Sequence, residues 1–257
     1  MRLSVIKSKL TEMLKEPNVD SFDELASFGP INDEKLISSF LKIDHRANDV
    51  NKQKLIKMMT ESGFLLEGHF SLLSGMHSKY FLSFNNLARS TPRLHAVSEL
   101  IADIIIDERI EVDAIIAPET AGSYLASVIG GILFKKGKKE VEMVYAKTDD
   151  DKKPTSIINY LGLKAGSKVL IVNDLVTTGA GIKELYNLST KYGVTVQGFV
   201  MFATRKRLQD IPWPPNSGQF RFALVDGSAL ENHTYRSSDC PICKNEQTKP
   251  VPSMYLN

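Results

Sequence analysis

The sequence predicts an α/β protein: a parallel, twisted sheet flanked by helices, with a helical extension at the N-terminus. Two observations support this prediction. From residue 94 onward, short apolar runs alternate with segments of helical periodicity. The apolar runs also lack the polar residues that a solvent-exposed face would place at every second position, so the sheet should be covered by helices on both sides.

The N-terminal region has its own pattern. Apolar residues recur at helical spacing in two segments, at Leu3, Ile6, Leu10 and Met13, and again at Leu36, Ile37, Phe40 and Leu41. A third helix is predicted from residue 51 to about residue 62, where Gly63 would end it. We expect residues 1–50 to form a helical extension that either packs on the main domain or docks a further partner.

The rest of the chain alternates between strands and helices. Buried strands are predicted at 112–118, 141–147, 168–174 and 194–205, and helices at 94–108, within 119–137 and after residue 174. In parallel sheets of this kind, ligands bind beyond the carboxyl ends of the strands. The loops that follow residues 118, 147 and 174 should therefore lie along one edge. The predicted division is an extension (1–50), a main domain (51–230) and a C-terminal tail (231–257).

The composition is that of an ordinary globular protein. The 257 residues are 42% hydrophobic and carry a formal charge of +2, which gives no reason to expect a surface for nucleic acid or membranes. No apolar stretch approaches the roughly 20 residues that span a bilayer, and the N-terminus lacks the apolar run of a secretory signal. Two cysteines make no disulfide framework, so a cytoplasmic location is expected.

The most informative stretch is residues 168–185, KVLIVNDLVTTGAGIKEL, in which a strand leads through a loop of small residues into a helix. Such a loop presents backbone N–H groups and the positive end of a helix dipole, which favour a phosphate. Thr177 and Thr178 add hydroxyl groups, and Gly179 and Gly181 let a ligand approach the backbone. The stretch lacks the Gly-Lys-Ser/Thr ending of a Walker loop, and a glutamate stands where a dinucleotide fingerprint has glycine.

A polar pair, Asn173 and Asp174, precedes this loop. Oxygen acceptors one short turn away from a bound phosphate are placed to take hydrogen bonds from sugar hydroxyls. The pair and the loop together predict a site for a ribose 5-phosphate. The structural alternative is an ordinary strand-to-helix turn with Asp174 near the helix start.

These residues resemble a known family. LIVNDLVTTGAG is similar to the phosphoribosyl pyrophosphate signature of type I phosphoribosyltransferases, and GHFSLLSGMHSKYF at 68–81 resembles the N-terminal substrate segment of orotate phosphoribosyltransferases. The similarity covers residues 63–226. It implies a type I phosphoribosyltransferase fold, a homodimer, and an enzyme that transfers phosphoribose from magnesium-bound phosphoribosyl pyrophosphate to a nitrogenous base. A pyrimidine such as orotate is the acceptor that the resemblance implies.

The resemblance also implies roles for individual residues. The 5-phosphate would be bound by Thr177, Thr178, Gly179, Ala180 and Gly181. The ribose hydroxyls would be bound by Asn173 and Asp174, with Asp174 also a catalytic residue and the Mg²⁺ ligand. The pyrophosphate loop would comprise Glu119, Thr120, Ala121 and Gly122, and the base segment Ser74, Gly75 and Lys79. A mobile loop would bring a catalytic lysine to the pyrophosphate, often from the neighbouring subunit, with Lys147, Lys152 and Lys153 as candidates. A plain helix start and a solvated surface loop are the structural alternatives.

The chain departs from the family pattern in two places. Asn173 stands where the signature is normally acidic, and an amide offers one oxygen acceptor and no negative charge. Orotate enzymes usually carry Arg-Lys after the strand and Lys-x-His-Gly in the loop, whereas this chain has Lys147-Thr148, no loop histidine and three aspartates at 149–151. These departures favour an alternative: a regulatory or effector protein that keeps the pocket but has lost or redirected the reaction, for example to hydrolysis.

The tail contains both cysteines of the chain, Cys240 and Cys243. With His233 as a possible third ligand, the set falls short of a four-ligand zinc site, although a symmetric partner could complete one. A redox pair is disfavoured because no helix start is expected directly after the thiols and a proline separates them. His69 and His77 flank the turn of the substrate segment and are expected to be hydrogen-bonded structural residues.

Overall fold

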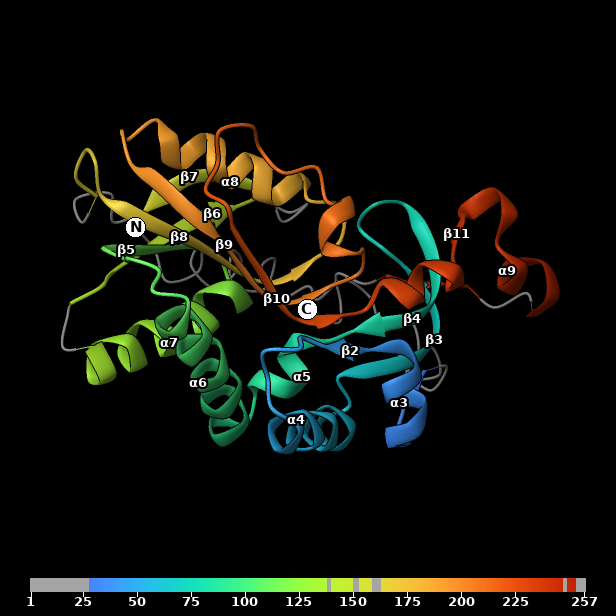
Figure 1. Cartoon of the computed structure of the whole chain (residues 1–257). Helices are drawn as coiled ribbons and strands as arrows, with labels where there is room; N and C mark the ends of the chain where they lie inside the picture. Colours follow the sequence, from blue (N-terminus) through green and yellow to red (C-terminus); the bar gives the residue numbers. More distant parts are fainter. Residues whose placement is uncertain (1–27, 138–139, 150–152, 159–162, 247–248, 253–257) are drawn as a thin grey trace, which may run out of the picture.

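The computed structural model describes residues 28–137, 140–149, 153–158, 163–246 and 249–252. Within these residues the chain forms a seven-stranded sheet and a five-stranded sheet, with helices packed around them (Figure 1). The predicted α/β class is confirmed. The first predicted N-terminal helix, at residues 3–13, lies outside the described residues. None of the described helices is long and apolar enough to cross a membrane.

The seven-stranded sheet has the order β2-β10-β9-β8-β5-β6-β7. Its strands are β2 (Lys42–Ile43), β5 (Ala114–Pro118), β6 (Glu142–Thr148), β7 (Pro154–Ile158), β8 (Lys168–Val176), β9 (Thr195–Thr204) and β10 (Phe220–Asp226). The five central strands are mutually parallel, as predicted, but both edge strands are antiparallel to their neighbours. The sheet is therefore mixed. Strand β7 forms within a segment predicted to be a loop, and its proline is tolerated because it begins an edge strand.

Helices cover both faces of this sheet (Figure 1). One face packs against α4 (Asp49–Ser62), α5 (Phe84–Ala88), α6 (Thr91–Asp107) and α7 (Ala121–Gly137), and the other against α8 (Ala180–Thr190). Alternate residues of β8 enter the two cores, with Leu170 and Val172 on one side and Val169 and Ile171 on the other. Burial on both faces explains why these strands are continuous apolar runs.

The N-terminal segment from residue 28 is built into both sheets. It contributes β1 (Gly29–Pro30) to the five-stranded sheet and β2 to the seven-stranded sheet, with α3 (Glu34–Phe40) between them. Asp33 caps α3 by accepting from two backbone N–H groups, and Gly63 ends α4 in the left-handed conformation. Ile37 is fully buried in the core shared with the main domain. The described part of the extension thus packs as a cap on that domain.

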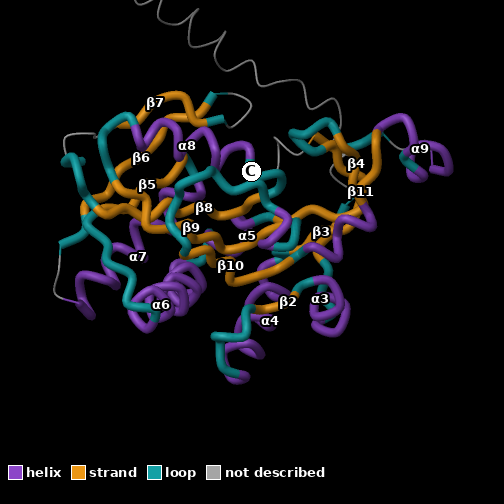
Figure 2. The backbone as a smooth tube through the Cα atoms, turned by 45° about the horizontal axis from the view of Figure 1, so that its top comes forward, coloured by secondary structure: helices purple, strands orange, loops and turns teal. Residues whose placement is uncertain are grey.

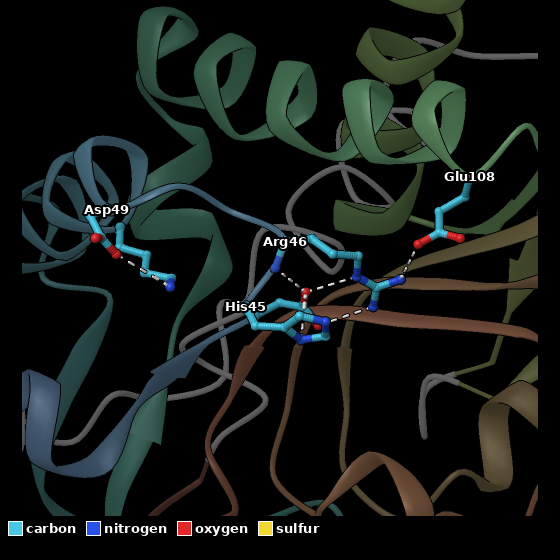
Figure 3. A network of polar contacts seen from close by, with 6 residues as sticks. His45, Arg46, Asp49 and Glu108 are labelled. Atoms are coloured by element: carbon cyan, nitrogen blue, oxygen red, sulfur yellow. Dashed lines mark hydrogen bonds and ion pairs between the residues drawn. The ribbon is translucent and has the colours of Figure 1, made fainter.

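An ion-pair network holds the loop between β2 and α4 (Figure 3). The Arg46 side chain donates to both oxygens of Asp44, at 2.8 and 3.0 Å, and reaches Glu108 at the end of α6, at 3.3 Å. Its guanidinium also lies 4.7 Å from the centre of the Phe222 ring on β10. Burial alone would raise the pKa of the Asp44 carboxyl, but the hydrogen bonds and charge of Arg46 outweigh it and hold that pKa below its ordinary value.

We expect Arg46→Met to lower the free energy of unfolding by about 2 kcal/mol at pH 7, because a partly buried carboxylate loses a charged hydrogen-bond partner. The folded-state pKa of Asp44 is depressed, so this stabilisation is present above the unfolded pKa of 3.8 and is lost as the pH falls through the folded value. Urea unfolding at pH 7 and pH 3.5 should therefore show a smaller difference between variant and parent at the lower pH. Lys52→Met is the control, since its partner Asp49 is exposed. Equal effects of the two variants would contradict the prediction.

The five-stranded sheet lies beside the carboxyl edge of the larger sheet (Figures 1 and 2). Its order is β1-β3-β4-β11, and β12 also pairs with β3. The strands are β3 (Leu65–Ser71), β4 (Met76–Leu82), β11 (Thr234–Arg236) and β12 (Val251–Pro252), and α9 (Pro241–Glu246) lies between the last two. Short 3₁₀ turns lie in this part of the chain: η2 (Leu208–Asp210) between β9 and β10, η3 (Ser228–His233) between β10 and β11, and η4 (Ser237–Asp239) between β11 and α9. The N-terminal cap, the hairpin and the tail therefore meet in one sheet.

Arg205, directly after β9, joins the two sheets. Its side chain is 4% exposed, and its guanidinium donates to the Tyr80 carbonyl at 3.0 Å, to Ser78 Oγ at 2.9 Å and to Thr234 Oγ1 at 3.1 Å. Burial lowers the pKa of Arg205 to about 10, which leaves the group charged at neutral pH. The β3–β4 hairpin is thus tied to the end of the central sheet from which ligand-binding loops emerge.

Candidate active site

The polar pair at the end of β8 lies where the strand ceases to be regular. Val172 and Leu175 are three residues apart and contact the same core, although a regular strand would place them on opposite faces. The side-chain oxygen Oδ1 of Asn173 accepts from the backbone N–H of Asp174 at 2.9 Å. Both side chains are partly buried. The amide of Asn173 therefore has a local structural partner in addition to any ligand.

The loop after β8 has the form of a phosphate cradle. Thr177, Thr178 and Ala180 are exposed, and α8 begins at Ala180 with Gly179 as its N-cap. The N-cap residue has no side chain to cap this helix, and the Ala180 N–H makes only a long contact of 3.4 Å to Thr178 Oγ1, so the N–H groups of the first turn face a position that a phosphate suits. Gly179 has a φ of +83°, and a Cβ atom there would lie 2.8 Å from Cγ2 of Ile211. The loop conformation thus depends on glycine at this position.

We expect Gly179→Ala to destabilise the fold by about 2 kcal/mol, because an L-residue is strained at positive φ and its Cβ would meet Ile211. The matched control is Gly131→Ala in α7, away from the cradle, where a Cβ meets nothing within 4 Å and alanine favours the helix. Thermal unfolding and inorganic phosphate titration of both variants provide the measurement. Only the Gly179 variant should lose stability and weaken phosphate binding; equal behaviour of the two would show that the cradle does not need this conformation.

The loop after β5 approaches the polar pair. A Cβ atom built on Gly122, in the first turn of α7, would lie 3.3 Å from Asn173 Oδ1. The N–H of Glu119 donates to the carbonyl of Ala146 on the neighbouring strand β6 at 2.9 Å, and the Glu119–Thr120 peptide bond is cis. Glu119 and Thr120 are exposed, whereas Gly122 is buried. The structure thus brings together the loops predicted to bind pyrophosphate and ribose.

The candidate lysines lie next to the same edge. Lys147 follows Ala146, which pairs with the last residue of β5, and its side chain is exposed. Lys153 is exposed at the start of the return to β7. Asp149 accepts from the Lys153 backbone N–H through its side chain at 2.8 Å and donates to the Lys153 carbonyl at 3.0 Å. One of the three unusual aspartates therefore has a local structural role. Lys152 lies outside the described residues.

The hairpin tip is joined to the site less directly. Ser74 and Gly75 form the exposed turn between β3 and β4, and Gly75 has a φ of +76°. Lys79 pairs with Glu67 across the hairpin at 2.9 Å, and this hydrogen bond raises the Lys79 pKa above its ordinary value. The contacts that reach the sheet edge come instead from Ser78 and Tyr80, through Arg205. Sequence reasoning missed Arg205, because ATRKR has the composition of an exposed basic segment.

The tail corrects two predictions. Among the described residues, His233 is not a member of the cluster that contains the two cysteines. Its ring packs instead against those of Phe40 and Tyr80, with centroids 5.4 and 5.1 Å away. A helix does begin directly after Cys240, because α9 starts at the proline between the two thiols. This proline is at the first helical position, where its missing N–H does no harm.

Comparison with known proteins supports the same interpretation of the edge. Residues 83–212, half of the chain, match the profile of the phosphoribosyl transferase domain. The chain belongs to the phosphoribosyltransferase family. It is 30% identical over 190 residues to the orotate phosphoribosyltransferase of Thermus thermophilus, covering 74% of this chain and 94% of that protein. It is 26% identical over 212 residues to the orotate phosphoribosyltransferase of Chlorobium phaeobacteroides, covering 81% and 98%.

A solved structure supports the fold. UMP synthase of Leishmania donovani matches with a TM-score of 0.57 at 20% identity, over 79% of this chain and 41% of that chain. The resemblance inferred from LIVNDLVTTGAG is thus confirmed, and the matched region contains the loops after β5, β6 and β8 that meet at the carboxyl edge of this phosphoribosyltransferase. The cysteine tail lies beyond the family match.

Proposed function

We propose that this protein transfers phosphoribose from phosphoribosyl pyrophosphate to a nitrogenous base, a pyrimidine such as orotate, with release of pyrophosphate. One observation carries the proposal: the uncapped start of α8, the polar pair before it and the loop after β5 lie together at the carboxyl edge of the sheet. Phosphate, ribose and leaving group of a single substrate can then contact three neighbouring chain segments. The names of the curated relatives support orotate as the base.

The proposed roles follow from the residue chemistry. The amides of Gly179, Ala180 and Gly181, with the hydroxyls of Thr177 and Thr178, would hold the 5-phosphate. Asn173 and Asp174 would bind the ribose hydroxyls, and the segment Glu119, Thr120, Ala121 and Gly122 would hold the pyrophosphate. Departure of pyrophosphate leaves positive charge on the sugar, so one nearby carboxylate stabilises the transition state without acting as a nucleophile. Asp174 is the residue that supplies this charge.

Magnesium fits this edge as an ion shared with the substrate. Mg²⁺ prefers oxygen ligands and is usually held by one or two carboxylates together with substrate phosphates. In the described part of the chain, no group of three or more carboxylates is placed to hold Mg²⁺ by itself, because the one cluster of potential metal ligands contains no carboxylate. Asp174 would therefore bind Mg²⁺ together with pyrophosphate oxygens, and the ion would neutralise charge on the leaving group.

The lysines and a second subunit complete the proposal. Lys147, Lys152 and Lys153 are candidates for the cation that meets the leaving pyrophosphate, and Ser74, Gly75 and Lys79 for contacts to the base. We propose a homodimer in the cytoplasm in which one of these lysines reaches the neighbouring subunit's site. Light scattering of the purified chain tests the dimer, and mixing of two inactive variants, one at a lysine and one at Asp174, tests the shared site by recovery of activity.

The deciding experiment follows pyrophosphate release from phosphoribosyl pyrophosphate and Mg²⁺, with and without orotate. Release that depends on orotate is expected. The rival is a regulatory or effector protein that binds the same ligand, and the amide at position 173 favours it. Ligand binding by calorimetry without turnover would support that rival, and release that does not depend on any base would indicate hydrolysis.

We expect Asn173→Asp to raise kcat about tenfold, because a second carboxylate contributes on the order of 1.5 kcal/mol to a cationic transition state. The aspartate can still accept from the Asp174 N–H, so the local structure should be kept. Asn187→Asp on the exposed surface of α8 makes the same change of charge and serves as control. An unchanged kcat in the position-173 variant would mean that the amide is not what limits the rate.

A further inference from the structure

The two cysteines of the tail lie against the two histidines of the β3–β4 hairpin. His69 is near the end of β3, His77 is on β4, Cys240 immediately precedes α9, and Cys243 is in its first turn. One potential ligand atom from each residue lies within 4.8 Å of the other three. Register explains the histidines, because Ser71 pairs with His77 and a β-bulge between residues 67 and 70 adjusts the strand that carries His69.

Four of the six distances among these atoms are those of a tetrahedral site, and the other two are within 4.8 Å. His69 Nε2 lies 3.2 Å from His77 Nδ1, 3.5 Å from Cys240 Sγ and 3.5 Å from Cys243 Sγ, and Cys243 Sγ lies 3.3 Å from His77 Nδ1. Zinc bonds of about 2.05 Å to nitrogen and about 2.3 Å to sulfur, at tetrahedral angles, separate two nitrogens by about 3.3 Å and nitrogen from sulfur by about 3.6 Å. The four separations agree with these values within a few tenths of an ångström.

We propose that His69, His77, Cys240 and Cys243 bind one zinc ion in a structural Cys₂His₂ site. Two thiolates and two imidazoles in a tetrahedron select zinc over hard cations such as Mg²⁺, which need oxygen ligands. Four protein ligands leave no open coordination position for a substrate or a water nucleophile. The site is therefore distinct from the proposed magnesium position and does not depend on the proposed reaction.

Burial separates this cluster from a chance surface grouping. His69 is 4% exposed and Cys240 is fully buried, while His77 and Cys243 are partly buried. Polar groups that are removed from water need partners, and both thiols have His69 Nε2 as a partner. A zinc ion replaces weak thiol–imidazole contacts with coordinate bonds to all four groups.

The role of the ion follows from the weakness of the local structure. Strands β11 and β12 have three and two residues, and α9 has six, so none of them would be stable alone. Among the residues that the structure describes, the separate core beneath this sheet has four buried members, Leu66, Phe70, Phe81 and Val251. Figures 1 and 2 show α9 projecting beyond the hairpin, away from the central sheet. Zinc would clip the tail to the hairpin, linking residues more than 160 positions apart in the chain.

Elemental analysis of the full-length protein, expressed without a histidine tag, tests the site. One zinc ion per chain is expected, without comparable iron or copper. Substitution by Co²⁺ should give the thiolate charge-transfer and intense ligand-field absorption of a tetrahedral Cys₂His₂ site. Neither measurement requires a variant. The proposal is overturned if reduced wild-type protein contains no zinc and takes up none on titration. It is also overturned if Cys240 and Cys243 are found joined in a disulfide and the protein still binds no zinc once that disulfide has been reduced.

Variants then test the ligand set. Cys243→Ser and His77→Asn should reduce zinc content at least tenfold, whereas His45→Asn, an exposed histidine, should keep it. His77→Cys should retain zinc as a Cys₃His site, because the ring nitrogen of His77 that faces the cluster is Nδ1, the one nearer to Cβ. His233→Gln should also retain zinc. If the His233 variant lost zinc and His77→Asn kept it, the proposed assignment of His77 as a ligand would be wrong.

Chelation supplies a readout of the structural role. A strong zinc chelator should lower the Tm of the wild-type protein and leave the Tm of Cys243→Ser unchanged, because that variant has no bound ion to lose. An equal Tm with and without zinc in the wild type would contradict the structural role.

Discussion

Replacing Arg205 by methionine is expected to lower the free energy of unfolding by about 3 kcal/mol, because two buried acceptors and one partly buried acceptor lose their charged donor. Methionine has a similar length, so little space is left empty. The loss is limited by two facts. The Tyr80 carbonyl also accepts from Ser78 Oγ at 2.8 Å, and the desolvation that lowers the Arg205 pKa to about 10 already reduces what the guanidinium contributes. A change of this size lowers Tm by about 10 °C in a domain of this length.

The chain contains a matched control for Arg205→Met. Arg207 lies two residues further on and is exposed, so Arg207→Met should change the free energy of unfolding by less than about 0.5 kcal/mol. Arg205→Lys should fall between the two, because one ammonium group cannot reach three acceptors with the geometry of a guanidinium fork. Chemical unfolding of the three variants gives the comparison. If Arg205→Met were as stable as the parent, the cost of burying the guanidinium charge would equal the energy of the hydrogen bonds that the guanidinium makes. Arg205 would then make no net contribution to holding the two sheets together.

Much of the central sheet could be predicted because its determinants are local. The continuous apolar runs of β5, β8 and β9 follow from burial on both faces, and Gly63 and Gly179 mark helix boundaries through their backbone conformation. The turn from β8 through Gly179 into α8 was predictable for the same reason, since neighbouring residues build it. Local patterns of this kind do not depend on which other elements the segment meets.

The full second sheet could not be predicted, because three of its five strands are too short to have a pattern. Strands β1, β11 and β12 have two or three residues each and are defined by their pairing with the hairpin. Arg205 and the cluster of His69 and Cys240 depend on tertiary contacts between segments more than 120 residues apart. Proximity in sequence favours His233 as a ligand, but β11 runs along β4 from Ser78 to Met76 and so carries the chain away from His233 before the cysteines follow.

Replacing Asp174 by asparagine is expected to lower kcat by about 100-fold. The position before it is already an amide, so the variant retains no carboxylate in the polar pair, and a charge-assisted contact contributes about 1.5–3 kcal/mol. Binding of inorganic phosphate should change little, because the amides at the start of α8 are untouched. This combination separates the role of the pair in the reaction from the role of the loop in binding.

The charge-swapped variant, Asn173→Asp combined with Asp174→Asn, decides whether position matters as well as charge. It keeps one carboxylate but moves it by one residue, to the place where a side-chain oxygen accepts the next backbone N–H and lies near Gly122. A carboxylate in that place has one oxygen engaged by the backbone, so we expect partial recovery, about tenfold over Asp174→Asn alone. Full recovery would show that only the net charge near the sugar is needed. If the folded variant showed no recovery in steady-state pyrophosphate release, the catalytic role would belong to position 174 itself. That result would explain how a chain with an amide at position 173 can remain an enzyme.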